Sequence, residues 1–257
     1  MRDWSTAWRV EALKLRRSVL ARVVTPLLLL VVPLASIGSV ALARRPDLPG
    51  TAAVKLGAYA TGPLAEAHLE VCGQILSVAA LVAGGFAAAW SFGREFTDGT
   101  AGALFGLAVP RSSIALAKGS LLACWLAGCV AIAVLLTLAI SPLAGGDLTT
   151  VGAEAGVALG AGVLGAGLAL PFGWVATVTR SMLGTVGILI GMVATTQVVV
   201  VLGAGSWFPY AVPSLWAGAG GREAAAQVTP AALLLTAAVA PAGLALLGRA
   251  WARLTDV

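Results

Sequence analysis

Residues 119–146 read GSLLACWLAGCVAIAVLLTLAISPLAGG, a stretch without a single ionisable side chain. An α-helix rises about 1.5 Å per residue, so about 20 apolar residues cross a hydrocarbon core of about 30 Å. Further charge-free stretches of at least this minimum length occupy 23–43, 71–93, 155–179, 181–221 and 224–248. The pattern predicts six transmembrane helices, at about 23–43, 71–93, 114–140, 154–178, 182–204 and 229–249.

The composition excludes a soluble globular domain. Of the 257 residues, 59% are hydrophobic and 11% charged, and the mean hydropathy is +0.96, which leaves too little polar surface for a protein in water. Backbone hydrogen bonds must be satisfied internally in lipid, and the apolar runs lack the alternation of barrel strands. The predicted fold class is therefore an all-α integral membrane protein with a six-helix bundle.

The distribution of lysine and arginine predicts the orientation of this bundle. Six helices place both termini on one side, and cytoplasmic flanks retain positive charge. With the termini in the cytoplasm, 12 of the 16 basic residues fall inside, and only Arg44, Arg45, Lys55 and Arg222 fall outside. The net charge of +5 is thus explained by topology rather than by binding of nucleic acid, for which no aromatic-basic module is present.

Residues 1–22 form a separate basic segment with helical periodicity. Its apolar stripe consists of Trp4, Trp8, Ala12, Leu15 and Val19. Arginines lie opposite this stripe, which predicts an interfacial helix on the cytoplasmic leaflet. Glu11 falls inside the apolar stripe. Because an unpaired carboxylate is costly there, we expect Glu11 to meet a cation from another segment or subunit.

The predicted cytoplasmic loop between the second and third helices is strongly patterned. It reads Gly93-Arg94-Glu95-Phe96-Thr97-Asp98-Gly99-Thr100, continues through an apolar run at 101–109, and ends at Pro110-Arg111. Asp98-Gly99 is a turn signal. The apolar run is too short to cross a membrane, so we expect it to pack against the bundle or in a partner's groove. The alternative is that the charges are solvated and only mark topology.

The order of these motifs resembles the permeases of type-two ABC exporters. The resemblance rests on Glu11-Ala12-Leu13-Lys14-Leu15-Arg16-Arg17-Ser18 before the first span, on 93–100 with Pro110-Arg111, and on Trp207-Phe208-Pro209-Tyr210 with Pro213-Ser214-Leu215-Trp216 between spans five and six. It extends over essentially the whole chain. It implies an amphipathic interface helix, a cytoplasmic coupling helix between spans two and three, and an outer re-entrant hairpin between spans five and six.

The resemblance also implies partners. Such a permease works as a homodimer or heterodimer in a bacterial-type inner or plasma membrane, and each copy docks on a cytoplasmic ABC ATPase subunit. The residues that would couple to the ATPase are Glu11, Lys14, Arg17, Arg94, Glu95, Thr97, Asp98, Gly99, Thr100 and Arg111. The chain has no Gly-x-x-x-x-Gly-Lys-Ser/Thr segment, so ATP and Mg would be bound by the partner, and we expect no enzymatic activity, cofactor or metal in this chain.

The cargo is constrained by the lack of charge in the spans. The charge-free stretches contain only uncharged polar side chains, and Gln74, Thr195, Thr196 and Gln197 are the candidates for a cargo pathway. Hydrogen bonds between helices are an equally good explanation of the last three. Without a buried ionisable group, ion-coupled transport is disfavoured. A hydrophobic or amphipathic cargo is favoured, such as a drug, a peptide antibiotic or a lipid, which would connect the chain to multidrug or antibiotic resistance.

The positions of small and polar residues predict close helix packing, an outer hairpin and a solvated histidine. Close helix packing is expected at Gly152, Gly156 and Gly160, and at Gly187 and Gly191. We expect an interfacial or re-entrant hairpin at 206–221. The polar loop at about 44–70 is predicted to leave His68 solvated.

Two other functional classes remain open at this point. An intramembrane enzyme needs a base or a ligand cluster inside the bundle, and the charge-free stretches contain no His, Asp or Glu. A non-transporting scaffold, sensor or immunity protein that pairs with an ATPase is the stronger alternative.

Overall fold

The computed structural model describes residues 2–45, 57–59, 62–99, 102, 109–149 and 151–254, and these residues contain helices and no strand. The α-helices are α1 (Arg2–Arg17), α2 (Val19–Pro26), α3 (Val32–Ala43), α5 (Leu64–Ala88), α6 (Arg94–Thr97), α8 (Arg111–Ile140), α9 (Gly152–Leu168), α10 (Pro171–Thr179), α11 (Met182–Val201), α12 (Val212–Trp216), α13 (Arg222–Ala226) and α14 (Pro230–Ala252). The π-helical and 3-10 segments are η1 (Leu27–Val31), η2 (Gly57–Tyr59), η3 (Ala89–Gly93), η4 (Ser141–Ala144) and η5 (Gly205–Trp207).

Six helical segments of the described residues are long and apolar enough to cross a membrane, as the sequence predicted. They are Val19–Ala43, Leu64–Thr97, Arg111–Ala144, Gly152–Thr179, Met182–Val201 and Pro230–Ala252. The second and third have 34 residues each, well above the roughly 20 that a bilayer requires. Their polar ends therefore extend past the apolar part of the bundle.

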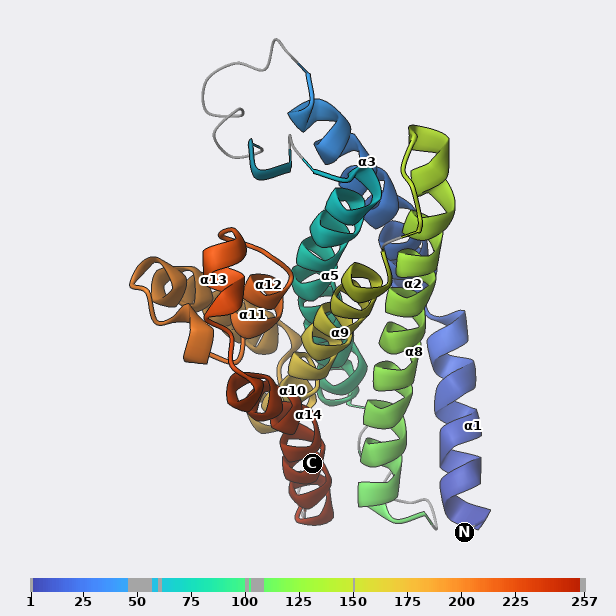
Figure 1. Cartoon of the computed structure of the whole chain (residues 1–257). Helices are drawn as coiled ribbons and strands as arrows, with labels where there is room; N and C mark the ends of the chain where they lie inside the picture. The colour runs from blue at the N-terminus through green and yellow to red at the C-terminus, as the bar shows by residue number, and fades with distance from the viewer. Residues whose placement is uncertain are drawn as a thin grey trace.

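The helices are arranged around α5, which packs against α3, α8 and α9. Both termini lie at the same end of the bundle in Figure 1, and we call it the terminal end. The segment from α11 to α13 lies to one side of α5, on the opposite side from α1 (Figure 1). The predicted amphipathic segment forms α1, which runs lengthwise beside α8 and packs against it (Figure 1).

Local chemistry sets the breaks between these elements. Ser18 has an extended backbone, with ψ 142°, and its side chain caps α2 by accepting from the Ala21 amide at 3.0 Å. This cap separates α1 from α2. Pro26 lacks an amide donor, and the helix widens into the π-helical segment η1 directly after it. A second π-helical segment, η3, leads from α5 into α6, and such widened turns are frequent at functional sites.

Close packing of α9 against α5 and α8 depends on glycines other than those expected. A Cβ added at Gly165 would lie 2.2 Å from the Ser77 backbone oxygen, and one at Gly162 would lie 2.6 Å from Val130. Of the five glycines predicted to pack closely, only Gly160 does so, against the Trp216 ring at 2.6 Å. The other four, Gly152, Gly156, Gly187 and Gly191, have nothing within 4 Å of an added Cβ, so they make no close approach to any residue that the structure describes.

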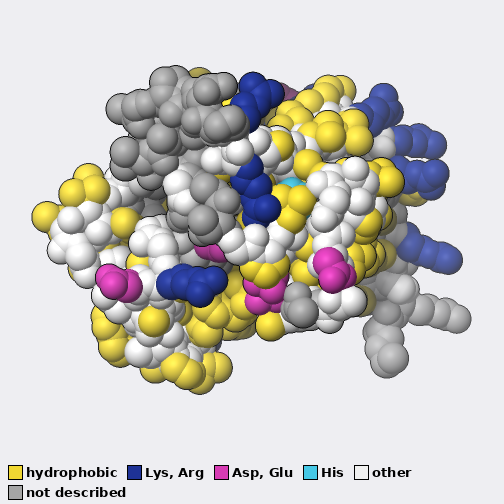
Figure 2. Space-filling model, turned by 45° about the horizontal axis from the view of Figure 1, so that its top comes forward, with side chains coloured by type: hydrophobic (Ala, Val, Ile, Leu, Met, Phe, Trp, Pro, Cys, Tyr) yellow, Lys and Arg dark blue, Asp and Glu magenta, His cyan; other side chains and the backbone are white. Residues whose placement is uncertain are grey.

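One expectation about the polar segments also changes. His68 is in α5, not in a solvated loop, and it is 1% exposed with Nδ1 2.9 Å from the Ser141 hydroxyl. The segment after α11 folds inward, because α12 packs against both α5 and α9 and Val212 is fully buried. Hydrophobic and uncharged side chains dominate the face shown in Figure 2, and Lys and Arg side chains project along the edge on the side of α1 (Figure 2).

Candidate functional site

A groove of about 600 Å³ opens at the terminal end between α1, α8 and the segment from η3 to α6. It combines seven charged side chains with apolar walls. Its lining residues are Glu11, Lys14, Leu15, Arg17, Ser18, Val19, Trp90, Ser91, Arg94, Glu95, Asp98, Lys118, Leu121 and Leu122. Six of the residues predicted to couple to an ATPase are among them, although they come from segments about 80 residues apart in the sequence.

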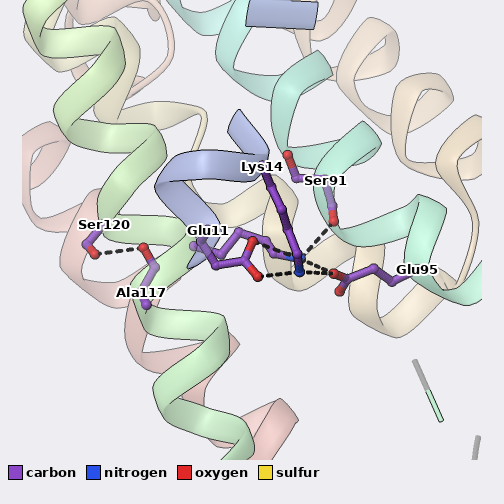
Figure 3. A network of polar contacts seen from close by, with 7 residues as sticks. Glu11, Lys14, Ser91, Glu95, Ala117 and Ser120 are labelled. Carbon is purple, nitrogen blue, oxygen red and sulfur yellow. Dashed lines mark hydrogen bonds and ion pairs between the residues drawn. The ribbon is translucent and has the colours of Figure 1, made fainter. Parts of the chain in front are cut away.

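The centre of the groove is a network of four charges, of which Lys14 alone is largely exposed. Lys118 of α8 forms an ion pair with Glu95 of α6 and lies 3.8 Å from Glu11 of α1. Lys14 bonds Glu11 at 2.6 Å and reaches Glu95 at 4.0 Å. Figure 3 shows the two carboxylates approaching from opposite sides, with Lys14 between them. Two cations and two carboxylates balance, so three helices are joined without net charge.

Burial makes Lys118 the central member of this network. Its side chain is 6% exposed, as is that of Glu11, whereas Lys14 is 48% exposed. Lys118 also donates to the Ser91 carbonyl of η3 at 3.1 Å, and its ammonium lies 5.1 Å from the Phe92 ring centre. A buried ammonium needs such partners, because an uncompensated charge in a low dielectric is strongly unfavourable.

The expectation that Glu11 meets a cation from another segment is confirmed, and Lys118 is that cation. Sequence reasoning missed Lys118 itself as a site residue. One signal was available: Lys118 and Arg111 lie seven residues apart, and no other charge occurs in α8. Residues at that spacing share one face of a helix, so both side chains were placed to meet neighbouring helices at the terminal end.

The rim of the groove is exposed and carries a different ion pair. Arg94 Nε donates to Asp98 Oδ2 at 2.7 Å, with the two side chains 56% and 44% exposed, and the guanidinium stacks over Trp90 at 5.2 Å. The helix continues to Thr97, whose hydroxyl bonds the Gly93 carbonyl.

The chain turns just after this helix. Gly99 has φ +66°, a left-handed conformation that favours glycine. Thr100, also predicted to couple, and most of the apolar run at 101–109 lie outside the described residues. The rim pair is solvated and contributes little to stability, which leaves its charges available for recognition.

The C-terminal helix closes the terminal end. The Arg111 side chain donates to the Leu254 carbonyl, which ties the start of α8 to the end of α14. Trp251 is fully buried, meets Phe92 and Phe96 edge to face, and donates through Nε1 to the Thr177 hydroxyl at 2.9 Å. The segment that carries Glu95 is therefore held between α1, α8 and α14.

The predicted pathway residues are not gathered into one site. Gln74 accepts from the Tyr59 hydroxyl at 2.7 Å and donates to the Ala217 carbonyl at 3.2 Å, so it ties η2 and the turn after α12 to α5. Burial raises the pKa of the Tyr59 phenol, which therefore stays protonated and can donate. On α11, Thr195 and Gln197 are exposed, and the Thr196 hydroxyl bonds its own helix at the Met192 carbonyl.

Comparison with known proteins identifies the family. A model of the family described as ABC-2 family transporter protein matches residues 8–198. The chain belongs to this family. The match begins inside α1, contains the whole charged groove, and extends nearly to the end of α11. No curated protein and no solved structure matches the chain.

Membership of the ABC-2 family agrees with the six apolar helices. The chain is a multi-pass membrane protein and an ABC-2 type permease, a family whose members generally work with ATPase partners.

Proposed function

We propose that this chain is the transmembrane subunit of an ATP-driven exporter whose ATPase is a separate cytoplasmic protein. The observation that carries the proposal is the charged network of Glu11, Lys14, Glu95 and Lys118, because it joins the N-terminal helix to the helix ends beside the exposed rim. A permease without its own ATP site needs such a connection between its cytoplasmic surface and its spans.

The orientation follows from the charges. Arg9, Arg17, Arg94, Arg111 and other basic residues lie in the segments that meet at the terminal end, which favours a cytoplasmic position for both termini. The rim pair of Arg94 and Asp98 would then face the ATPase, with Gly99 and Thr100 at the turn. A homodimer or heterodimer of permease subunits would present two such rims.

The mechanism we propose is mechanical. When two ATPase subunits close on ATP and Mg, each rim is displaced, and Glu95 passes the displacement to Lys118 of α8 and Glu11 of α1. Because these side chains are buried and mutually paired, the three helix ends move as one body. The long helices Leu64–Thr97 and Arg111–Ala144 carry the movement to the opposite end of the bundle.

The cargo we propose is hydrophobic or amphipathic: a drug, a peptide antibiotic or a lipid. Support comes from the apolar spans, whose charge-free stretches offer no group for coupling to ion movement. Gln74 is the candidate pathway residue with partners on two other segments, so it can respond when those segments move.

Affinity purification from the native membrane in mild detergent, followed by mass spectrometry, tests the proposal. We expect a stoichiometric ABC ATPase to remain bound, and ATP hydrolysis by the complex to exceed that of the ATPase alone. Reproducible absence of an ATPase from a folded preparation would favour the scaffold, sensor or immunity alternative.

A further inference from the structure

A second charged site lies on the outer face of α14, away from the groove. A depression between α10 and α14 is lined by Trp174, Leu246, Arg249, Ala250 and Arg253. Leu246, Arg249 and Ala250 of α14 and its C-cap residue Arg253 follow one another at intervals of three, one and three residues, so they share one face of the helix. Over the described part of the chain, the lining of the depression carries two guanidinium groups and no acidic residue.

These two arginines differ from three cations of α6 and α8 at the terminal end. Arg94 pairs with Asp98, Arg111 with a carbonyl, and Lys118 with two carboxylates. Among the residues that the structure describes, neither Arg249 nor Arg253 makes an ion pair or a side-chain hydrogen bond, and both side chains are exposed. Their charge is available to a ligand from outside the chain.

The lining changes from apolar to basic along the helix axis. A Cβ added at Gly173 of α10 would lie 3.5 Å from the Leu247 side chain of α14. Trp174 follows Gly173 in α10, so it is level with Leu246 at the apolar end of the depression. Arg253 lies seven residues further, about 10 Å along α14. Since Pro230–Ala252 is a candidate span, the apolar end belongs to the membrane interior and the arginines to its boundary.

We propose that this depression binds one anionic phospholipid. Its phosphate would lie between the guanidinium groups of Arg249 and Arg253, which match a phosphate by paired N–H donors. An acyl chain would follow Leu246 and the Trp174 ring. Basic pockets between membrane helices have this recognised chemistry, and the apolar half of the depression favours a lipid over a soluble phosphate.

The bound lipid would brace α14 against α10. The inner face of the same helix carries Trp251, which packs on Phe92 and Phe96 beside the charged groove. Lipid occupancy is therefore expected to stabilise the terminal end. The inference requires only that the chain spans a membrane, so it stands apart from the proposed ATPase coupling.

Native mass spectrometry of the purified full chain in detergent tests the site. The chain is titrated with phosphatidylglycerol. Phosphatidylcholine is the control lipid without net charge, and glycerol phosphate is the headgroup without acyl chains. We expect one tightly bound phosphatidylglycerol, weaker phosphatidylcholine and no retained glycerol phosphate. An arginine near an anionic lipid surface contributes about five-fold in affinity, so R249Q/R253Q is expected to weaken phosphatidylglycerol binding by about 25-fold.

Two further variants make the outcome decisive. R44Q/R45Q removes the same charge from an exposed pair outside the depression and is expected to leave the affinity unchanged, while R249K/R253K is expected to retain part of it. Equal affinity of the wild type and R249Q/R253Q for phosphatidylglycerol would overturn the proposal. A loss of affinity in R44Q/R45Q equal to that in R249Q/R253Q would also overturn it, as would glycerol phosphate binding as strongly as phosphatidylglycerol.

Discussion

Replacing Lys118 with methionine removes the buried cation on which the groove depends. Lys118 and Glu11 are both 6% exposed, and Glu95 is 13% exposed. Loss of one partner from a buried ion pair costs about 3–5 kcal/mol. Lys14 remains 2.6 Å from Glu11, so one carboxylate keeps a cation. We therefore expect Lys118→Met to lower the free energy of unfolding by about 3 kcal/mol.

The assay is unfolding of the purified chain in mixed micelles with increasing denaturing detergent. Lys14→Met is the matched control, because it removes the same charge from the same carboxylates at a side chain that is 48% exposed. Exposed pairs contribute at most about 1 kcal/mol, so this variant is expected to remain close to the wild type.

A second substitution separates the ion pair from simple packing. Glu95→Gln added to Lys118→Met removes the opposite charge, so we expect the double variant to recover about 2 kcal/mol relative to the sum of the single changes. The reasoning is refuted if Lys118→Met costs no more than Lys14→Met, or if the two single effects simply add.

Three further predictions concern the rim and the core. Asp98→Lys reverses an exposed charge, so the unfolding free energy should stay within about 0.5 kcal/mol of the wild type. ATP hydrolysis by the purified complex should fall. Unchanged ATP hydrolysis would mean that Asp98 is not part of the coupling surface. Gly165→Ala drives a methyl group into a backbone oxygen of α5 and should cost at least about 3 kcal/mol in detergent unfolding. Its control, Gly156→Ala in the same helix, has open space and should be neutral or slightly stabilising; similar losses in both would contradict the packing account. Thr177→Val removes the acceptor of the buried Trp251 indole N–H and should lower the unfolding free energy by about 1–3 kcal/mol. The same unfolding titration measures this loss. An unchanged unfolding free energy would mean that the indole finds another acceptor.

The sequence predicted the number of spans because charge-free length is a strong local signal. Six apolar stretches became six helical segments. The same signal places the ends of helices less well, because polar residues near the ends can be buried by neighbouring helices. His68 illustrates this: it lies among polar residues in the sequence, but α5 begins at Leu64 and buries it beside Ser141.

The candidate site was predictable in part. A carboxylate in an apolar stripe requires a cation, so Glu11 pointed to a partner without naming it. Lys118 could not be singled out from the sequence, because several basic residues were possible partners of Glu11. The tertiary packing of α1 along α8 decides which of them Glu11 meets. Glu95 was expected in a loop, but the helix continues through η3 and α6 and buries it. Glycine spacing was a poor guide for the same reason, since Gly162 and Gly165 face α8 and α5 while Gly156 faces outward.

Site-specific photocrosslinking in the native membrane tests the central claim most directly. A photoreactive amino acid is placed at Asp98, on the exposed rim, or at Leu143, which is 86% exposed in η4, just past the far end of α8. The account predicts an adduct with an ABC ATPase from position 98 and none from position 143, each identified by mass spectrometry. An ATPase adduct from position 143, with none from position 98 in a correctly inserted chain, would contradict it.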